Sequence, residues 1–422
     1  PFASAWSRPA AFAAGSIAVV VAWTSFGPRS MFIISSRTFE LVTDYTLVAI
    51  PMYVLMASLI ERSGIARDLY SALNRVFGPY RGGVLIATLV IAFILGATTG
   101  IVGGEVVLLG LVALPQMMRL GYSNKLTLGT ITAGGSLGTM VPPSIVLILY
   151  GITAGVSISD LFMATLTPAL LLVSLYAGYV LLRVWYDPSL APPMSTEQIG
   201  QPASPMQALR NVGFPVFIVL CVLGSIYAGL ASITESAAFG VLGVMIAVML
   251  RGEFSISMLR GALAQTMVTC GVVLWLVFGT NALIGVYNAV GGIRFAQTLI
   301  SDVAAEPAML ITITILVFLI LGFFVDWIGI LFLTTPIFLP LIREAGFDPV
   351  WFGVIFNMTV QIAYLTPPFA PSAFYLKSVA PPSVSLMDIY RSSLPFIGLQ
   401  ILALALVIAF PQIALWLPGL MR

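Results

Sequence analysis

The chain has 422 residues, of which 59% are hydrophobic and only 8% are charged, and its net charge is +2. Soluble domains carry about 25% charged residues, so a chain this poor in charge cannot cover a water-facing surface. The small net charge gives no reason to expect a nucleic-acid partner. The sequence holds no histidine, and its two cysteines lie in apolar segments, which removes the usual catalytic bases and metal clusters. The composition predicts a polytopic membrane protein that is not an enzyme.

Apolar runs of spanning or near-spanning length follow one another along the chain. They fall near residues 10–27, 45–60, 83–117, 126–156, 160–182, 212–230, 232–250, 262–290, 307–342, 350–380 and 393–418. One long polar stretch, rich in Pro, Ser and Gln, interrupts them at 185–211 and indicates an exposed linker. We therefore expect a first membrane half at 1–184 and a second at 212–422.

The basic residues of the loops predict the orientation of the first half. The loop at 61–82 holds four arginines and the preceding loop two, so the positive-inside rule places 61–82 and the N-terminus in the cytoplasm. The next basic loop, with Arg119 and Lys125, should face the same side. The run 83–117 must then enter and leave on one side, as a re-entrant hairpin. Its tip is predicted at Gly96–Gly100, because Gly and Thr allow tight backbone geometry and offer oxygens at membrane depth.

The second half repeats this arrangement. Two spans bring the chain back to a cytoplasmic loop, and the run 262–290 crosses outward. Residues 307–342 should form a second hairpin that enters from outside, with its tip at Gly322–Asp326. A broken span at 350–380 then returns to the cytoplasm. The sequence thus predicts nine spans and two hairpins, with the C-terminus in the periplasm.

The two halves are related by a repeat at a separation of 225 residues. The matched positions are Leu114-Pro115 with Leu339-Pro340, Gly121 with Gly346, Pro142-Pro143 with Pro367-Pro368, and Tyr150 with Tyr375. With small slippage, Asp160 matches Asp388 and Pro168 matches Pro395. So many matches in nearly one register are hard to ascribe to chance. In the predicted orientation the two copies cross the membrane in opposite directions.

The two Pro-Pro pairs should mark breaks in two spans. Proline has no amide donor and clashes with the preceding turn, so two in a row end one half-helix and leave carbonyls free. Inverted repeats with broken helices are typical of secondary transporters, which bind substrate and ions near the membrane midplane. A simpler alternative is that each pair kinks a packed helix. The fold prediction is an all-α polytopic membrane protein with an inverted-topology repeat, two re-entrant hairpins and two broken helices.

Three acidic residues, Glu105, Glu235 and Asp326, lie in otherwise apolar runs. An acid inside the membrane is costly and is by default a functional hypothesis. Asp326 lies at a hairpin tip and could support an ion site or make a structural hydrogen bond. We expect a structural role for Glu235, and Glu105 is either protonated or faces a water-filled vestibule. Lys377, just past the second break, could attract a carboxylate or extend to the membrane surface.

Three segments resemble one family, the large membrane subunit of tripartite ATP-independent periplasmic (TRAP) transporters. They are "GGSLGTMVPPSIVLILYG" from Gly134, "GFFVDWIGILFLTTPIFLPLIREAGFDPVWFGV" from Gly322, and "LTPPFAPSAFYLKSVAPPSVSLMDIYRSSLPF" from Leu365. "IPMYVLMASLIERSGIARDLY", from Ile50, is also similar to the family, and the resemblance covers nearly the whole chain. The third segment looks most like the branch named for mannitol, chloroaromatic and 2-oxo acid substrates.

The resemblance implies a system of three proteins in a bacterial or archaeal inner membrane. A periplasmic solute-binding protein captures the solute, and a small membrane subunit packs against the large one. The large subunit of such a system, which resembles the ion transporter superfamily, imports a small organic acid by an elevator motion driven by a sodium gradient. No cofactor other than the coupling Na⁺ is implied.

The resemblance also implies two sodium sites and a substrate site. The first sodium site should lie between the first hairpin tip and the first break, at Gly96, Thr98, Thr99, Gly135, Gly138, Thr139 and Pro142. The second should lie between the second tip and the second break, at Gly322, Asp326, Thr366, Pro367 and Pro368. The substrate should lie between the tips, near Thr99, Gly100, Ser144, Phe369 and Lys377. The family usually has a serine-rich run at the first tip, and this chain has "GATTGIVGG" instead.

Three other functions fit part of these observations. A self-sufficient sodium–carboxylate symporter would share the hairpins and the repeat but would need no binding protein. A passive channel is also compatible, although paired breaks with hairpins favour alternating access. A membrane-embedded enzyme would need a polar catalytic cluster, and the sequence offers no nucleophile with a base beside it.

Overall fold

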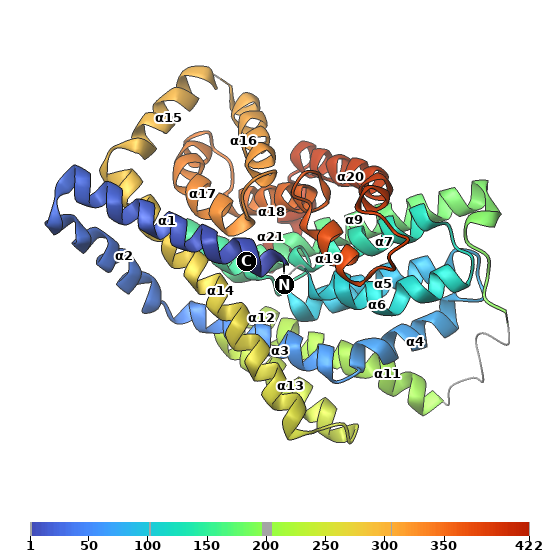
Figure 1. Ribbon diagram of the computed structural model, residues 1–422. Coiled ribbons are helices and arrows are strands. Elements are labelled where there is room, and N and C mark those ends of the chain that lie inside the picture. The colour runs from blue at the N-terminus through green and yellow to red at the C-terminus, as the bar shows by residue number, and fades with distance from the viewer. Residues whose placement is uncertain (1, 101–102, 196–204, 305, 422) are drawn as a thin grey trace.

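The structure is a computed structural model of the chain, and it describes residues 2–100, 103–195, 205–304 and 306–421. These residues form helices joined by short turns, and they contain no strand (Figure 1). Six helical segments within the described residues are long and apolar enough to cross a membrane: Tyr45–Arg62, Ile158–Tyr186, Ile233–Leu250, Ile256–Ala289, Trp327–Glu344 and Leu386–Ala409. The all-α prediction is confirmed.

One set of helices, the flanking group, borders the rest of the molecule on the left and below in Figure 1. It comprises α1 (Phe2–Phe26), α2 (Met31–Val42), α3 (Ala49–Arg62), α4 (Ile65–Phe77), α11 (Pro205–Val219), α12 (Ser225–Tyr227), α13 (Ile233–Leu250), α14 (Ile256–Ala289) and α15 (Gly292–Val303). Small side chains allow α1 to pack closely along α14, where Ala18 and Ala22 are buried with Ala282 and Val286. Close approach through small residues is the usual way in which helices associate in lipid.

The remaining helices form the hairpin group. They are α5 (Gly83–Thr99), α6 (Gly104–Arg119), α7 (Asn124–Ser136), α8 (Ile145–Ala154), α9 (Ile158–Tyr186), α16 (Pro307–Gly322), α17 (Trp327–Glu344), α18 (Pro349–Leu365), α19 (Pro371–Val379), α20 (Leu386–Ala409) and α21 (Gln412–Met421). Helices α5 and α6 make hairpin 1, and α16 and α17 make hairpin 2. Each hairpin is followed by a broken helix, α7/α8 or α18/α19.

The repeat extends through five successive units. The run α3, α4, hairpin 1, α7/α8 and α9 has the same element order as α14, α15, hairpin 2, α18/α19 and α20. Equivalent turns share their backbone conformation: Gly121 and Gly346, after α6 and α17, have φ values of 75° and 81°. Both Pro-Pro bonds are cis. The two copies also contact each other, since α6 packs on α19 and α17 packs on α8.

The hairpins begin and end close to their predicted limits, and the other boundaries differ more. The run 393–418, predicted as one span, is divided between α20 and α21, because Pro411 has no amide hydrogen with which to continue α20. The region between α1 and α3, predicted as a loop, holds helix α2. Helical structure extends into both ends of the predicted linker, since α9 continues to Tyr186 and α11 begins at Pro205. The division into two halves at this linker remains a prediction.

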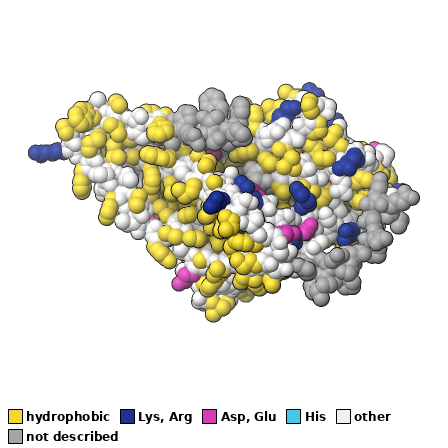
Figure 2. All heavy atoms as spheres, turned by 60° about the horizontal axis from the view of Figure 1, so that its bottom comes forward, with side chains coloured by type: hydrophobic (Ala, Val, Ile, Leu, Met, Phe, Trp, Pro, Cys, Tyr) yellow, Lys and Arg dark blue, Asp and Glu magenta, His cyan; other side chains and the backbone are white. Residues whose placement is uncertain are grey.

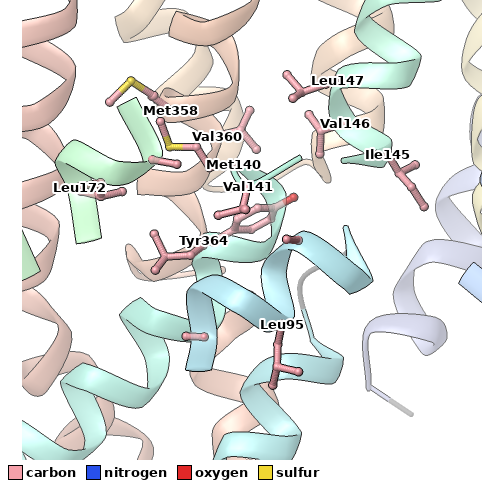
Figure 3. Close-up of a cluster of buried hydrophobic side chains, with 14 of the residues drawn as sticks. Leu95, Met140, Val141, Ile145, Val146, Leu147, Leu172, Met358, Val360 and Tyr364 are labelled. Atoms are coloured by element: carbon pink, nitrogen blue, oxygen red, sulfur yellow. The ribbon is translucent and has the colours of Figure 1, made fainter. Parts of the chain in front are cut away.

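Apolar side chains cover much of the surface as well as the interior. Figure 2 shows them across the face that it draws, with charged side chains standing singly or in small groups. Inside, a continuous cluster surrounds the helix breaks (Figure 3): Leu95 comes from hairpin 1, Met140 and Val141 from the first break, and Met358 and Val360 from α18. A surface this apolar suits lipid, and the residues of the first break lie in an apolar interior.

Candidate functional site

Hairpin 1 lies directly on the first break, which we call break 1 (residues 140–144). A Cβ placed on Gly96 would lie 3.1 Å from the Gly138 Cα, tighter than most Cβ contacts, so glycine favours this close approach. Beyond the hairpin arm, a Cβ on Gly100 would lie 2.5 Å from the Pro143 carbonyl oxygen. The Ile145 amide donates to the Gly100 carbonyl at 3.3 Å. The structure therefore brings the tip of hairpin 1 against the start of α8.

The residues predicted for the first sodium site lie around this contact. Thr98 and Thr139 are buried, and their hydroxyls donate to the carbonyls of Leu95 (2.7 Å) and Ser136 (3.2 Å). Each hydroxyl oxygen thus keeps lone pairs that can face a cation. Gly135 lies against Val106 of α6, and Pro142 is buried in break 1. The side chain of Thr99 is outside the described part of the chain.

Glu105 lies within the same group of residues. It is the second residue of α6 and is 1% exposed, and a Cβ on Gly138 would lie only 2.1 Å from its Oε1. The carboxyl group therefore faces the turn that precedes break 1. The sequence singled out Glu105 but did not assign it to a site. Its position in the hairpin could have indicated a role in the site. Glu105 lies in the first turn of α6, the second arm of hairpin 1, and Asp326 lies at the equivalent place, directly before α17, the second arm of hairpin 2.

Hairpin 2 lies on the second broken helix in a similar way. Gly322, the last residue of α16, faces α18 so closely that a Cβ would lie 2.5 Å from the Ala363 Cβ. Asp326 is the N-cap of α17, and its carboxylate accepts from the Ile328 amide at 3.5 Å. This bond gives Asp326 a structural role, as one of the two alternatives expected. A carboxylate at this position is also favoured by the helix dipole.

The second break, break 2 (residues 366–370), is more open than break 1. Thr366 and Pro367 are half-buried and Pro368 is exposed, whereas residues 138–144 are all buried. The Thr366 hydroxyl donates to the Ile362 carbonyl at 2.7 Å and so keeps its lone pairs. Ala370 has a φ of 32°, a conformation that is strained for a residue with a Cβ. Strain of this kind is often found at functional sites.

A small cavity lies between hairpin 2 and α18. Its volume is about 10 Å³, enough for about one water molecule or ion. Its lining consists of Gly322, Val325, Trp327, Ile330, Val360, Ala363, Tyr364 and Phe369. The cavity is thus lined by one residue predicted for the second sodium site, Gly322, and by one predicted for the substrate site, Phe369.

The predicted substrate residues do not all lie together. Gly100 and Ser144 meet at the tip of hairpin 1, and Phe369 lies at break 2. Lys377, in the last turn of α19, donates instead to the Val384 carbonyl at 2.5 Å, in the connection to α20. Its ammonium group therefore stabilises that connection.

Tyr375 lies against the tip of hairpin 1, and sequence reasoning did not assign it to the site. A Cβ on Gly103 at the tip of hairpin 1 would lie 2.9 Å from the Tyr375 Cζ. The repeat could have drawn attention to this residue, because its mate Tyr150 is fully buried and donates to the Pro349 carbonyl at 2.8 Å.

Two further polar residues cross from one repeat to the other. Asn357 of α18 donates through Nδ2 to the Thr139 carbonyl at 3.0 Å, and Gln361 donates through Nε2 to the Ser136 hydroxyl at 3.3 Å. Both side chains are buried. In the part of the chain that the structure describes, no group of three or more His, Cys, Asp or Glu side chains could hold a metal ion. The polar groups around the two breaks are therefore hydroxyl, carbonyl and amide groups, with one carboxyl group beside each: Glu105 at break 1 and Asp326 at hairpin 2.

Two hairpins seated on two helix breaks, in an apolar all-helical chain with an internal repeat, define a secondary transporter of the inverted-repeat class. The chain matches the family described as "Tripartite ATP-independent periplasmic transporter, DctM component" over residues 3–413, and it belongs to that family.

Several relatives support the same assignment. The ectoine TRAP transporter large permease protein TeaC of Halomonas elongata is 31% identical over 380 residues, which cover 89% of this chain and 86% of TeaC. The C4-dicarboxylate TRAP transporter large permease protein DctM of Pseudomonas aeruginosa is 27% identical over 397 residues, covering 93% of this chain and 91% of the relative. These relatives are transporter permease subunits, so the prediction that the chain is not an enzyme is confirmed.

A solved structure supports the fold. The YdaH transporter of Alcanivorax borkumensis, whose crystal structure is described as showing an unusual topology, superposes with a TM-score of 0.68 at 11% identity and covers 98% of this chain and 100% of its own. The predicted fold class is confirmed. The chain is a large membrane permease subunit that works with a periplasmic binding protein and a small membrane subunit.

Proposed function

We propose that this permease imports a small organic acid, such as a 2-oxo acid, together with sodium ions, by an elevator motion in the inner membrane. The N-terminus would be cytoplasmic and the C-terminus periplasmic. The observation that carries the proposal is that each hairpin tip lies on a helix break whose surroundings are rich in neutral oxygens. Na⁺ would be the coupling ion, and no other cofactor is required.

The two sodium ions would bind where hairpin and break meet. Backbone carbonyls at unwound helix segments are the usual sodium ligands in transporters of this architecture. At break 1 they are joined by the hydroxyl oxygens of Thr98 and Thr139, and at break 2 by that of Thr366. Asp326 would add a negative charge near the second ion.

The organic acid would bind between the two tips. Helices α8 and α19 begin at the two breaks, and the N-terminal end of a helix attracts an anion. The Tyr375 phenol can donate a hydrogen bond to a carboxylate from the same region. Among the relatives, a large permease protein of Escherichia coli is named for 2,3-diketo-L-gulonate, a name that itself describes a 2-oxo acid.

The elevator motion would carry the hairpin group past the flanking group. The hairpins and the broken helices pack on one another across the repeats, which favours their movement as one body. Helices α3 and α14, the first elements of the two copies, pack together within the flanking group. The binding sites would travel with the hairpin group.

A liposome assay tests the proposal. The chain would be reconstituted with its small subunit, and uptake of a labelled 2-oxo acid would be followed with and without an inward sodium gradient and with and without the binding protein. Uptake that needs both supports the proposal. Uptake with a sodium gradient but without the binding protein would assign the chain to the self-sufficient symporters. An uptake rate that is the same with and without the sodium gradient would contradict sodium coupling.

A further inference from the structure

Asn357 and Gln361 are buried on α18, and their hydrogen-bond partners determine which way each side-chain amide is turned. The Thr139 carbonyl can only accept a hydrogen bond, so the atom of Asn357 that faces it must be Nδ2. The Ser136 hydroxyl already donates to the Ala133 carbonyl at 2.8 Å, so it can only accept from Gln361. Neither amide can therefore be turned over.

This orientation leaves two oxygens without a hydrogen bond. Asn357 Oδ1 and Gln361 Oε1 are both buried and have no hydrogen-bond partner among the described residues. Asn357 is 0% and Gln361 1% exposed, so bulk water does not reach them. A buried acceptor left unsatisfied is costly, and in an apolar interior the cost rises. Figure 3 shows how apolar this interior is, with Met358 and Val360 of α18 close to Met140 and Val141.

Both oxygens are close to the first sodium site. Asn357 and Gln361 are four residues apart, so they lie on one face of α18. Because the oxygen and nitrogen of a carboxamide share one carbon atom, each oxygen stays near the group that its nitrogen contacts. Those groups belong to Ser136 and Thr139, directly before break 1.

We propose that Asn357 and Gln361 are ligands of a monovalent cation at break 1, so that the first ion site is built from both repeats. The inference rests on the proposed sodium coupling and names residues that the sequence did not assign. The ligands are neutral oxygens, which suit a dehydrated monovalent ion. A water molecule could donate to both oxygens, but its own lone pairs would then face the hydroxyl and carbonyl oxygens of break 1. A cation is complementary to all of these groups.

The experiment measures sodium binding alone, without any solute. The purified full chain with its small subunit would be titrated with ²²Na⁺, and its melting temperature would be followed in NaCl and in choline chloride. Asn357→Leu and Gln361→Met keep the side-chain size and remove the oxygens. Each should weaken sodium binding about tenfold or more, as lost support of an ion site usually does.

Two controls separate binding from folding. Thr359→Val changes a buried residue of the same helix whose hydroxyl donates within the helix, to the Ile355 carbonyl at 2.7 Å, and should leave sodium affinity unchanged. Gln361→Glu keeps an oxygen and adds a charge, so sodium should bind at least as tightly as in the unmodified chain. These results, with equal melting temperatures in choline, support the proposal.

Three outcomes overturn it. Unchanged sodium affinity in Asn357→Leu and Gln361→Met would show that the oxygens hold only water. Equal weakening by Gln361→Met and Gln361→Glu, with a lower melting temperature in choline, would show a purely structural role. If the unmodified chain binds no sodium, the proposed sodium coupling fails as well, and the two failures are thereby distinguished.

Discussion

Gln361 donates a hydrogen bond to Ser136 at 3.3 Å, and the two residues are 225 positions apart, which is the separation of the internal repeat. Equivalent residues of two copies can meet only where the axis that relates the copies passes between them. The axis therefore runs between α7 and α18, just before break 1. A second bond across the copies, from Asn357 to the Thr139 carbonyl, lies one turn away on α18. The two broken helices are thus held together at the centre of the hairpin group.

A side chain at position 138 should clash with the Glu105 carboxyl group and destabilise the protein. In Gly138→Ala the new Cβ would lie 2.1 Å from the Glu105 Oε1, so we expect a loss of about 1–3 kcal/mol of stability by overpacking. Thermal unfolding in detergent measures it. Gly178→Ala, in α9 with nothing within 4 Å, is the control and should change stability by at most about 1 kcal/mol. A double change Gly138→Ala/Glu105→Ala should recover part of the loss, and no recovery would contradict the clash.

The two tyrosines of the repeat should respond differently to loss of their hydroxyls. Tyr375→Phe should raise the KM for the organic acid roughly tenfold, because it removes one hydrogen bond to a charged carboxylate. The melting temperature should stay unchanged. Tyr150→Phe removes the bond to the Pro349 carbonyl and should cost about 1 kcal/mol of stability with an unchanged KM. Uptake kinetics and thermal melts of both variants provide the comparison. An unchanged KM in Tyr375→Phe would remove Tyr375 from the substrate site.

The effect of the Asp326 charge on sodium binding can be separated from the effect of its N-cap hydrogen bond on stability. Asparagine is as good an N-cap as aspartate, so Asp326→Asn should keep α17 intact while removing the charge. We expect the sodium concentration for half-maximal uptake to rise about tenfold, with little change in the melting temperature. Asp326→Ala, which also loses the cap, should lower the melting temperature. A variant Asp326→Asn with normal sodium dependence would leave Asp326 with its structural role alone.

An ion pair in the flanking group should matter for stability and not for transport. Arg251, whose side chain is 7% exposed, pairs with Asp68 of α4 and with Glu253. Arg251→Ala should cost about 1–2 kcal/mol, because bonds to charged groups exceed ordinary ones. Arg37→Ala removes a pair with Glu40 at 3.4 Å that is largely exposed, and should cost about 0–0.5 kcal/mol. Equal losses in the two variants would contradict this ranking.

Much of the fold was predictable because hydropathy, loop charge and the repeat all act over short stretches of sequence. The hairpins at 83–117 and 307–342 agree with α5/α6 and α16/α17 within a few residues. The split at Pro411 was missed, because a single proline inside an apolar run can either end a helix or only kink it.

The site was only partly predictable, for a physical reason. Glycines and prolines have distinctive backbone properties, so the sequence itself indicated a tip at Gly96–Gly100 and a break at Pro142-Pro143, which the structure brings together. Gly138 was named only through the family resemblance, and sodium binding at these residues stays a prediction. Asn357 and Gln361 lie in an apolar helix, and their importance comes from partners more than 200 positions earlier in the chain. Lys377 looked suited to an anion, yet its ammonium group binds the Val384 carbonyl nearby.

The unequal exposure of the two breaks has a kinetic consequence. Pro368 at break 2 lies on the surface of the chain, whereas every residue from 138 to 144, in and just before break 1, is buried. If sodium binds as proposed, an ion at break 2 would exchange with the surroundings more directly, while an ion at break 1 would be released only after a surrounding helix moves aside. Even with equal affinities, the two ions would arrive and depart at different rates. The last ion to bind and the first to leave would be the one at break 2.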